Sequence, residues 1–462
     1  MADPLWTSAE IARATGGAEG GGFTATGVSI DTRTLEPGDL FVALAGVRDG
    51  HEFVAQAMAR GAAGALVSQD VDAPFVKAGD TLAALEQLGV AARERATKAR
   101  RAAVTGSVGK TSVTQAIIAG LELAGPAHAS VKSYNNHIGV PLTLARMPAA
   151  TARAVFEIGM NHADEIRPLA TFVRPHAALV TTVGPVHTEN FPDGEAGVAR
   201  AKAEVFAGLE PGGVAVLNAD NRWFDLLKAE ALRAGAVIRT FGTGEGCDAR
   251  LIDFQVPGGH AVVQARLHGK AVDFPILQTG LHWGLNSMAV LLMLEALDVD
   301  LDKSLAALGA FEPLAGRGAE SVVQAPRGAF TLIDESYNAN PVSMASAIKT
   351  LGVRSTSGRR IVALTDMLEL GPETLAYHAG LAEPLEGASI DLVFCAGPLM
   401  KSLWDALPPT RRGGYAESAA ALAPQLAQAV ESGDVVMVKG SNGSKAGLIA
   451  QALAALGARE AG

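Results

Sequence analysis

The feature that most constrains the fold is a short glycine-rich segment between a strand and a helix. Ala102-Ala103-Val104 has the pattern of a buried strand, and the stretch from Ser112 to Ala124 has the apolar spacing of a helix. Between them lies Thr105-Gly106-Ser107-Val108-Gly109-Lys110-Thr111-Ser112. A buried strand that turns through glycines into a helix is typical of an α/β domain with a parallel sheet. We therefore expect at least one such domain.

This segment also has the chemistry of a phosphate-binding loop. Glycines let backbone N–H groups converge on phosphate oxygens, and the N-terminus of the following helix adds a positive dipole. Lys110 can reach the β- and γ-phosphates, and the Thr111 hydroxyl can bind Mg²⁺. Val104 stands where the generic pattern has its first glycine, so a glycine turn with an accidental Gly-Lys-Thr is the alternative. The predicted ATP-binding residues here are Gly106, Ser107, Val108, Gly109, Lys110, Thr111 and Ser112.

Apolar strands separated by helical lengths recur along the 462 residues. Strand-like runs occur at 40–43 and 65–67, then at 154–158, 177–181 and 214–217, and again at 330–333, 360–364, 392–395 and 435–438. This alternation predicts parallel sheets with crossover helices, and the length suggests about three domains. We expect an α/β protein with domains at 1–98, 99–312 and 313–462.

Composition argues against several classes of protein. The formal net charge is −10, and the one basic run, from Arg93 to Arg101, is interpreted as a solvated helix end, so nucleic-acid binding is not expected. No uncharged apolar run reaches the roughly 18 residues that cross a bilayer. The first 17 residues lack the apolar core of a signal peptide, which predicts a cytoplasmic protein. The two cysteines are interpreted as packing residues.

Polar residues follow two of the predicted parallel strands at the edge where α/β sites form. Glu157 ends the strand at 154–158, and His187 follows the strand at 177–181. With Thr111 they would form an oxygen-rich set with one imidazole, which suits Mg²⁺. The alternatives are a solvated carboxylate and a structural histidine. Farther on, His282 and Asn286 share a helix face, either beside the nucleotide or at a domain interface.

The central motifs, taken in order, resemble those of the Mur ligase family. The loop 105–112 has the shortened form seen in these enzymes and in folylpolyglutamate synthases. The further motifs are Asn135-Asn136-His137-Ile138-Gly139-Val140-Pro141, Glu157-Ile158-Gly159-Met160-Asn161, Gly184-Pro185-Val186-His187, Ala201-Lys202-Ala203-Glu204-Val205-Phe206 and Asn218-Ala219-Asp220-Asn221. The resemblance implies a magnesium site of Thr111, Glu157, His187 and Lys202, with Lys202 carbamylated by CO₂. The alternative for Lys202 is a helix-surface lysine paired with a carboxylate.

The C-terminal motifs narrow the resemblance to one branch of the family. Leu314-Ala315-Gly316-Arg317 is similar to the Pro-Gly-Arg motif, whose arginine is expected to swing toward the γ-phosphate on domain closure. The segment from Asp334 to Pro341 is close to the signature of the D-alanyl-D-alanine-adding branch, and no Asp-Asn-Pro-Arg motif of the diaminopimelate adders occurs. Segments 365–371 and 438–445 resemble two further motifs. The implied nucleotide contacts are Arg317, Asp334, His282 and Asn286, and the implied substrate contacts are Tyr337, Asn338, Asn340, Asn135 and Asn136.

The N-terminal segment resembles the UDP-binding domain of the later-acting Mur ligases. The matching stretches are 29–33, 37–44 and 49–51, and the implied substrate residues are Ser29, Asp31, Arg33 and His51. Asp31 and Arg33 could equally form an internal ion pair. The implied architecture has three domains, with a phosphate-loop ATPase-like parallel sheet in the centre and a Rossmann-like C-terminal domain.

The resemblance implies an ATP-dependent ligase of cell-wall synthesis. It would add D-Ala-D-Ala to UDP-MurNAc-tripeptide through an acyl phosphate, with Lys110, Lys202, His187 and Arg317 in catalysis and two Mg²⁺ ions. We expect a monomer without membrane insertion. The nearest alternative is a diaminopimelate- or lysine-adding ligase that acts on UDP-MurNAc-dipeptide. A folylpolyglutamate synthase and a non-catalytic nucleotide-sugar-binding relative are the more distant ones.

Overall fold

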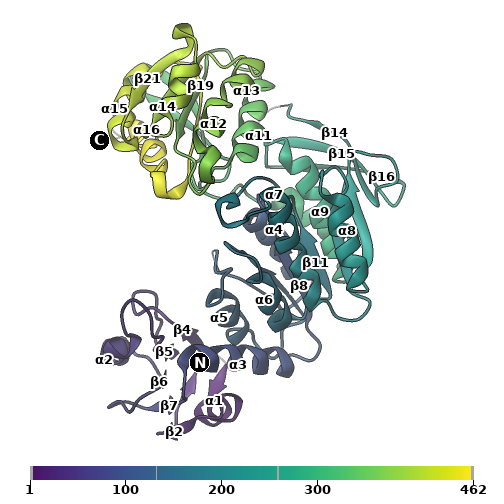
Figure 1. Cartoon of the computed structure of the whole chain (residues 1–462), viewed down its shortest axis with the longest axis vertical. Helices are drawn as coiled ribbons and strands as arrows, with labels where there is room; N and C mark the ends of the chain where they lie inside the picture. The colour runs from purple at the N-terminus through teal and green to yellow at the C-terminus, as the bar shows by residue number, and fades with distance from the viewer. Residues whose placement is uncertain (1–3, 132, 258–259, 459–462) are drawn as a thin grey trace.

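The computed structural model describes residues 4–131, 133–257 and 260–458, and its three large sheets follow one another along the chain. Figure 1 shows them as three units along the long axis, from the N-terminal unit through the central one to the C-terminal one. No helix within the described residues has both the length and the apolar character needed to cross a membrane.

The N-terminal unit is built on a five-stranded sheet of order β2-β7-β6-β5-β4. Its strands are Ala18–Gly20, Phe75–Lys77, Gly64–Val67, Asp39–Val42 and Gly27–Ser29, and β1 (Trp6–Thr7) pairs separately with β3 (Thr24–Ala25). The helices are α1 (Ser8–Thr15), α2 (Val54–Ala59) and α3 (Thr81–Arg95), which leads into the central unit. Ile11 of α1 and Leu85 of α3 are fully buried in one core with the sheet.

The central unit is a nine-stranded sheet covered on both faces. The strand order is β16-β15-β14-β13-β12-β11-β8-β10-β9. In chain order the strands are Arg100–Thr105 (β8), Ala127–Ala129, Arg153–Glu157, Ala177–Val180, Val214–Asn218, Val237–Gly242, Ala249–Gln255, Ala261–Leu267 and Lys270–Ile276 (β16). Helices α5 (Gly139–Ala145), α6 (Ile166–Val173), α7 (Glu195–Ala203) and α8 (Phe224–Arg233) pack on one face, and α4 (Lys110–Leu123), α9 (His282–Ala296) and α10 (Leu301–Ala310) on the other.

The C-terminal unit is a six-stranded sheet of order β17-β18-β22-β19-β20-β21. Its strands are Ala319–Ala325, Gly328–Glu335, Val435–Lys439, Arg360–Thr365, Leu392–Ala396 and Arg412–Ala416. Helices α11 (Pro341–Gly352), α13 (Ala382–Gly387) and α14 (Lys401–Ala406) pack on one face beside α12 (Thr374–Ala379), and α15 (Ala419–Ala429) and α16 (Gly447–Ala458) cover the other.

The expected parallel sheets are mixed sheets with a parallel core. Strands β8 to β14 of the central unit pair in parallel, but β14, β15 and β16 form an antiparallel meander at one edge. In the C-terminal unit β17 and β18 form an antiparallel hairpin. The parallel core is the part that positions the site, because the carboxyl ends of parallel strands lie on one edge.

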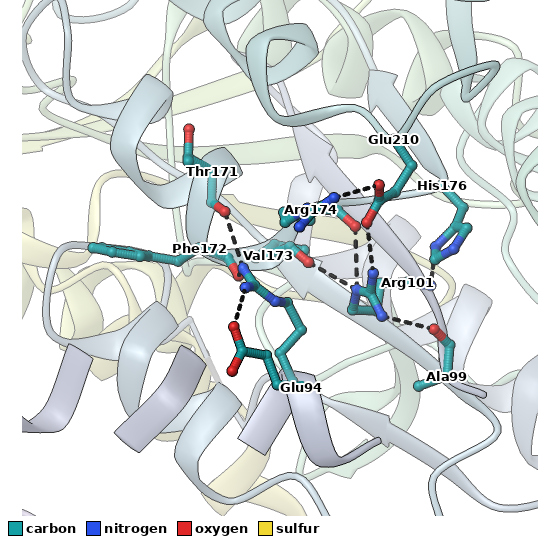
Figure 2. Close-up of polar contacts among 10 residues, drawn as sticks. Glu94, Ala99, Arg101, Thr171, Phe172, Val173, Arg174, His176 and Glu210 are labelled. Atoms are coloured by element: carbon teal, nitrogen blue, oxygen red, sulfur yellow. Dashed lines mark hydrogen bonds and ion pairs between the residues drawn. The ribbon is translucent and has the colours of Figure 1, made fainter. Parts of the chain in front are cut away.

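The basic run from Arg93 to Arg101 is not the solvated helix end that the sequence suggested. Arg101 is buried, and Figure 2 shows it donating to the carbonyls of Val173 and Arg174 and pairing with Glu210. Arg93 donates to the carbonyl of Phe172 at 2.8 Å. The last carbonyls of a helix lack partners inside that helix, so these guanidinium groups satisfy the end of α6 and tie α3 to the central unit.

Candidate functional site

The phosphate loop lies between β8 and α4, as the sequence predicts, and its backbone requires glycine at Gly106. This residue has φ of 148°, and a Cβ atom there would come within 1.9 Å of Thr181 Oγ1. That hydroxyl donates to the carbonyl of Val108 at 2.6 Å. Gly109 has φ of 87° and lies against the amide of Asn286. Thr181, directly after β11, therefore supports the loop on one side, and Asn286 of α9 lies against its other side.

The cations at the loop come from two different units. Lys110 Nζ donates to the carbonyl of Gly106 at 2.7 Å. Arg317, from the segment that enters the C-terminal unit, donates to Thr111 Oγ1 at 3.1 Å. Burial, with a smaller effect of Arg317, lowers the pKa of Lys110, and Glu157 opposes this. Arg317 was expected to swing in only on closure, but it already contacts the loop because the C-terminal unit is docked here.

Glu157 has the properties of a cation ligand. It ends β10 and is 1% exposed. Asn135 donates to its Oε1 at 2.6 Å, while Oε2 is buried without a hydrogen-bond partner. A buried carboxylate oxygen without a partner is costly, and a hard cation such as Mg²⁺ is the ligand it accepts. Asn135, which the sequence assigned to substrate, therefore orients this carboxylate.

His187 lies on the loop after β11 and has φ of 57°. Its Nδ1 is 2.9 Å from Glu369 Oε2 of the C-terminal unit. Burial, with smaller effects of Lys202 and Lys110, lowers the pKa of His187 to about 4. The imidazole is therefore neutral at physiological pH, so its contact with Glu369 is a polar contact rather than an ion pair. A neutral imidazole is the form that binds metals.

Lys202 is buried on α7, which excludes the surface-lysine alternative. The whole residue is 2% exposed, and no ion pair among the described residues includes Lys202. Burial, and then the charge of Lys110, lowers its pKa well below the usual value. Burial disfavours the charged form of a lysine and so shifts it toward the neutral, nucleophilic amine.

These residues fit a magnesium site in which the protein supplies only some of the ligands to the ion. Within the described ranges no three His, Cys, Asp or Glu side chains are grouped closely enough to hold a metal ion. The available donors are Glu157 Oε2, His187 and the Thr111 hydroxyl, and Mg²⁺ usually takes few protein ligands and keeps waters and phosphate oxygens. A carbamate on Lys202 would add the missing anionic oxygen.

A small cavity of about 20 Å³ lies between the central and C-terminal units, beside the loop. It is lined by His282 and Trp283 of α9, by Gln278, and by Arg317 and Glu335 from the other side. Burial lowers the pKa of His282, with Lys439 adding to this and Glu335 opposing it. Asn286 lies one turn farther along α9, toward Gly109. Trp283 packs in the core against Phe311, with ring centroids 5.7 Å apart.

The loop after β18 reaches the phosphate loop through a residue that sequence reasoning missed. Ser133 Oγ lies 3.4 Å from Thr111 Oγ1 and 3.3 Å from the Tyr337 hydroxyl. The guanidinium of Arg317 stacks over the Tyr337 ring at 4.1 Å. Ser133 stands two positions before Asn135, but a lone serine in a loop carries no pattern that would have identified it.

Other predicted residues have local structural roles. Asn340 is buried and caps α11 with a capping box, and the substrate contact expected of it stays a prediction. The Asn136 side chain accepts from Ile138 N and Gly139 N at the start of α5. Asp334 Oδ1 accepts from Ser336 N, and Asn338 Oδ1 accepts from Ala339 N. The backbone carbonyl of Asn338 accepts from the buried Lys439, which also pairs with Glu335.

The four N-terminal residues do not form one open site. Ser29 is buried in a turn with Asp31, and Asp31 pairs with Arg33 at 2.7 Å, so the ion-pair alternative is the arrangement present. The Arg33 side chain is nevertheless 86% exposed and accessible to an anion. Both ring nitrogens of His51 are engaged, one with Asp49 and the other accepting from Ser68 N, so His51 holds its loop together.

Comparisons with known proteins agree with this geometry. Three family models match, described as the Mur ligase family catalytic domain at 24–97, the Mur ligase middle domain at 104–294 and the Mur ligase glutamate ligase domain at 320–442. A UDP-N-acetylmuramoyl-tripeptide–D-alanyl-D-alanine ligase of Escherichia coli is 36% identical over 82% of this chain and 83% of its own length. The chain belongs to the Mur ligase family.

Further relatives match nearly the whole length of this Mur ligase and support its place in the family. The enzyme of the same name from Bacillus subtilis is 33% identical over 91% of both chains. A crystal structure of MurF from Acinetobacter baumannii superposes with a TM-score of 0.84 at 27% identity, over 97% of this chain and 99% of that one. MurF from Thermotoga maritima, solved in complex with ADP, has the same fold, with a TM-score of 0.78 at 22% identity over 94% of this chain and 98% of that one.

Proposed function

We propose that this Mur ligase joins D-alanyl-D-alanine to UDP-MurNAc-tripeptide at the expense of ATP, which gives UDP-MurNAc-pentapeptide for peptidoglycan. The observation that carries the proposal is the contact of the D-Ala-D-Ala-type signature with the phosphate loop. Tyr337 of that signature reaches Thr111 through Ser133, and Arg317 bridges the two. The curated relatives in Escherichia coli and Bacillus subtilis carry the name of this activity.

The reaction is acyl activation followed by amide formation. The γ-phosphoryl group of ATP passes to the terminal carboxylate of the tripeptide and leaves ADP. The amine of D-Ala-D-Ala then attacks the acyl carbon of the acyl phosphate, and phosphate departs with its bonding electrons while the amine loses a proton. Phosphoryl transfer depends on positioning and charge neutralisation. Lys110 and Arg317 provide two fixed cations on the loop.

The cofactor part of the proposal is two Mg²⁺ ions held by Thr111, Glu157, His187 and a carbamate on Lys202. Bound Mg²⁺ would neutralise phosphate charge. Carbamylation joins the neutral lysine amine to the carbon of CO₂ and releases one proton, so it converts a neutral buried amine into an anion. The buried position of Lys202 and the unpartnered Oε2 of Glu157 both support this arrangement. His282 and Asn286 would face the nucleoside.

The remaining assignments complete the proposal. The units at 1–98, 99–312 and 313–462 would hold the UDP end of the substrate, ATP and the incoming dipeptide, respectively. The exposed guanidinium of Arg33 is the N-terminal group best placed to meet a diphosphate, because its charge is accessible. We expect a cytoplasmic monomer, since ATP is available in that compartment. The alternative acceptors are diaminopimelate and lysine.

Product analysis tests the proposal. The enzyme is incubated with ATP, Mg²⁺, UDP-MurNAc-tripeptide and D-Ala-D-Ala, and the nucleotide products are separated and weighed by mass spectrometry. The expected product has the mass of the tripeptide substrate plus the dipeptide minus one water, and it is absent without ATP. A mixture in which the tripeptide substrate persists unchanged while ATP is hydrolysed would contradict the proposal.

A further inference from the structure

A buried ion pair joins the carboxyl ends of two neighbouring strands in the C-terminal unit. Glu335 and Lys439 are aligned in the parallel pairing of β18 with β22, and Lys439 Nζ lies 3.2 Å from Glu335 Oε2. The Lys439 side chain is 3% exposed. Replacing a buried ion pair by apolar residues is often neutral or stabilising. Stability alone therefore does not account for this pair.

The same ammonium group also holds the turn that follows β18. Lys439 Nζ donates to the backbone carbonyl of Asn338 at 3.0 Å. Two positions after this lysine, Ser441 Oγ donates to the carbonyl of Ala339 at 3.4 Å. The end of β22 therefore fixes two successive carbonyls of the turn. The bond from Lys439 is the stronger of the two, because its donor is charged and the distance is shorter.

The turn is fastened in its own right to the segment that carries Arg317. The backbone N–H of Tyr337 donates to the carbonyl of Gly316 at 3.0 Å. Gly316 has φ of 70°, and a Cβ atom there would come within 3.0 Å of Tyr337 Cβ. The guanidinium of Arg317 lies 4.1 Å from the centroid of the Tyr337 ring and donates to Thr111 Oγ1. A continuous path of contacts thus runs from Lys439 to the phosphate loop.

We propose that Lys439 is a positioning residue that holds Arg317 in place at the phosphate loop. Its contacts, Glu335 and Asn338, lie at the end of β18 and in the turn after it, so it acts through the turn. Lys439 fixes the Asn338 carbonyl, and this sets the Tyr337 ring on which Arg317 rests. A cation assists phosphoryl transfer only where its charge meets the transferred group. The inference rests on the proposed phosphoryl transfer from ATP.

A double-mutant cycle tests this role. Lys439→Met removes the ammonium group and keeps an apolar stem, and Glu335→Gln/Lys439→Met also removes the carboxylate that would otherwise stay unpaired. Each change is made in the wild type and in Arg317→Ala. The control is Lys349→Met, at an exposed position on α11. Phosphoryl transfer is measured in single turnovers with radiolabelled ATP, UDP-MurNAc-tripeptide and D-Ala-D-Ala, and the Kd for ADP is measured by titration.

In the wild-type background both Lys439 variants should lose about 100-fold in rate, the cost of misplacing a reacting group by about 1 Å. In Arg317→Ala the same changes should cost little more, because the residue through which Lys439 acts is already gone. The Kd for ADP should stay near the wild-type value, because ADP lacks the phosphoryl group that Arg317 is proposed to meet. Lys349→Met should match the wild type in both measurements.

An equal fold-loss in the two backgrounds overturns the inference, because that is the result of a purely structural role. A wild-type rate in Lys439→Met overturns it as well, and a wild-type rate in Glu335→Gln/Lys439→Met would mean that Lys439 only neutralises Glu335. A markedly weaker Kd for ADP would show damage to the phosphate loop itself and also overturns it.

The cycle survives two complications. If Lys439→Met does not fold, Glu335→Gln/Lys439→Met carries the test, because it leaves no buried charge unpaired. If the wild type transfers phosphate only with another acceptor, the proposed function is wrong, and the same cycle is run with that acceptor. Failure of the positioning role and failure of the proposed function are thus separate results.

Discussion

At the scale of single residues, the site depends on ionisable groups that are buried away from water. Lys110 lies on the phosphate loop beside the cation of Arg317 and the carboxylate of Glu157. Its charge is useful there because no water needs to reorganise as phosphate charge develops. The same low-dielectric surroundings depress the pKa of Lys202. Lys110 thus meets the phosphates, while burial shifts Lys202 toward its neutral amine.

Lys110→Ala should lower ATP turnover about 100- to 1000-fold, the usual cost of losing one transition-state donor. The melting temperature should change little, because Lys110 is the first residue of α4 and does not belong to the hydrophobic core of the central unit. Steady-state phosphate release measures the rate, and Lys228→Ala, which removes an exposed lysine from α8, is the control. A Lys110→Ala enzyme as fast as the control would remove Lys110 from catalysis.

Lys202→Ala should abolish most activity, and short carboxylic acids such as acetate should restore part of it by supplying an anion in place of the carbamate. Removing CO₂ from the buffer should slow the wild type and leave the rescued variant unaffected. In wild-type enzyme supplied with ¹³CO₂, a carbamate carbon resonance should appear, and Lys202→Ala should lack it. Normal turnover in the variant without added acid would contradict the carbamate proposal.

At the scale of elements, the phosphate loop between β8 and α4 has a backbone conformation at Gly106 that only glycine can adopt. Gly106→Ala would drive a methyl group into Thr181 Oγ1 and force φ out of its present range. We expect loss of nucleotide binding, measured by titration with a fluorescent ADP analogue. Gly244→Ala, where nothing lies within 4 Å of the new Cβ, should bind as the wild type does. Equal affinities in the two variants would show that the loop tolerates the change.

The buried cluster around Arg101 of β8, within the central unit, gives a stability prediction. Arg101→Met leaves Glu210 without one cation and leaves carbonyls at the end of α6 without donors. Breaking a buried pair in this way costs roughly 3 kcal/mol or more, so the midpoint of denaturant unfolding should fall clearly. Arg60→Met, at an exposed position, is the control. An unchanged midpoint for Arg101→Met would mean that this cluster does not stabilise the central unit.

The sequence predicts the parallel core of each sheet well and the edges poorly. The strands at 154–158 and 435–438 were recognisable because burial on both faces produces continuous apolar runs. The antiparallel strands β14 to β16 carry alternating polar residues and left no such signal. The burial of Arg101 was hidden for a similar reason, because its partners are carbonyls of a distant helix end rather than side chains with a sequence pattern.

At the scale of the whole molecule, the candidate site lies where the central and C-terminal units meet. The phosphate loop, Glu157, His187 and Lys202 come from the central unit, whereas Arg317, Tyr337 and Glu369 come from the segment beyond it. Residues with a family motif could be named from sequence. Ser133 and the pairing of Glu369 with His187 could not, because both depend on how two units dock.

The central claim is the choice of acceptor, and phosphate release tests it most directly. The enzyme receives ATP and Mg²⁺ with either UDP-MurNAc-tripeptide plus D-Ala-D-Ala or UDP-MurNAc-dipeptide plus diaminopimelate or lysine. The account predicts rapid release in the first mixture, which stops when D-Ala-D-Ala is omitted, and only background in the others. Release that requires diaminopimelate or lysine with the dipeptide substrate, and that ignores D-Ala-D-Ala, would contradict the account.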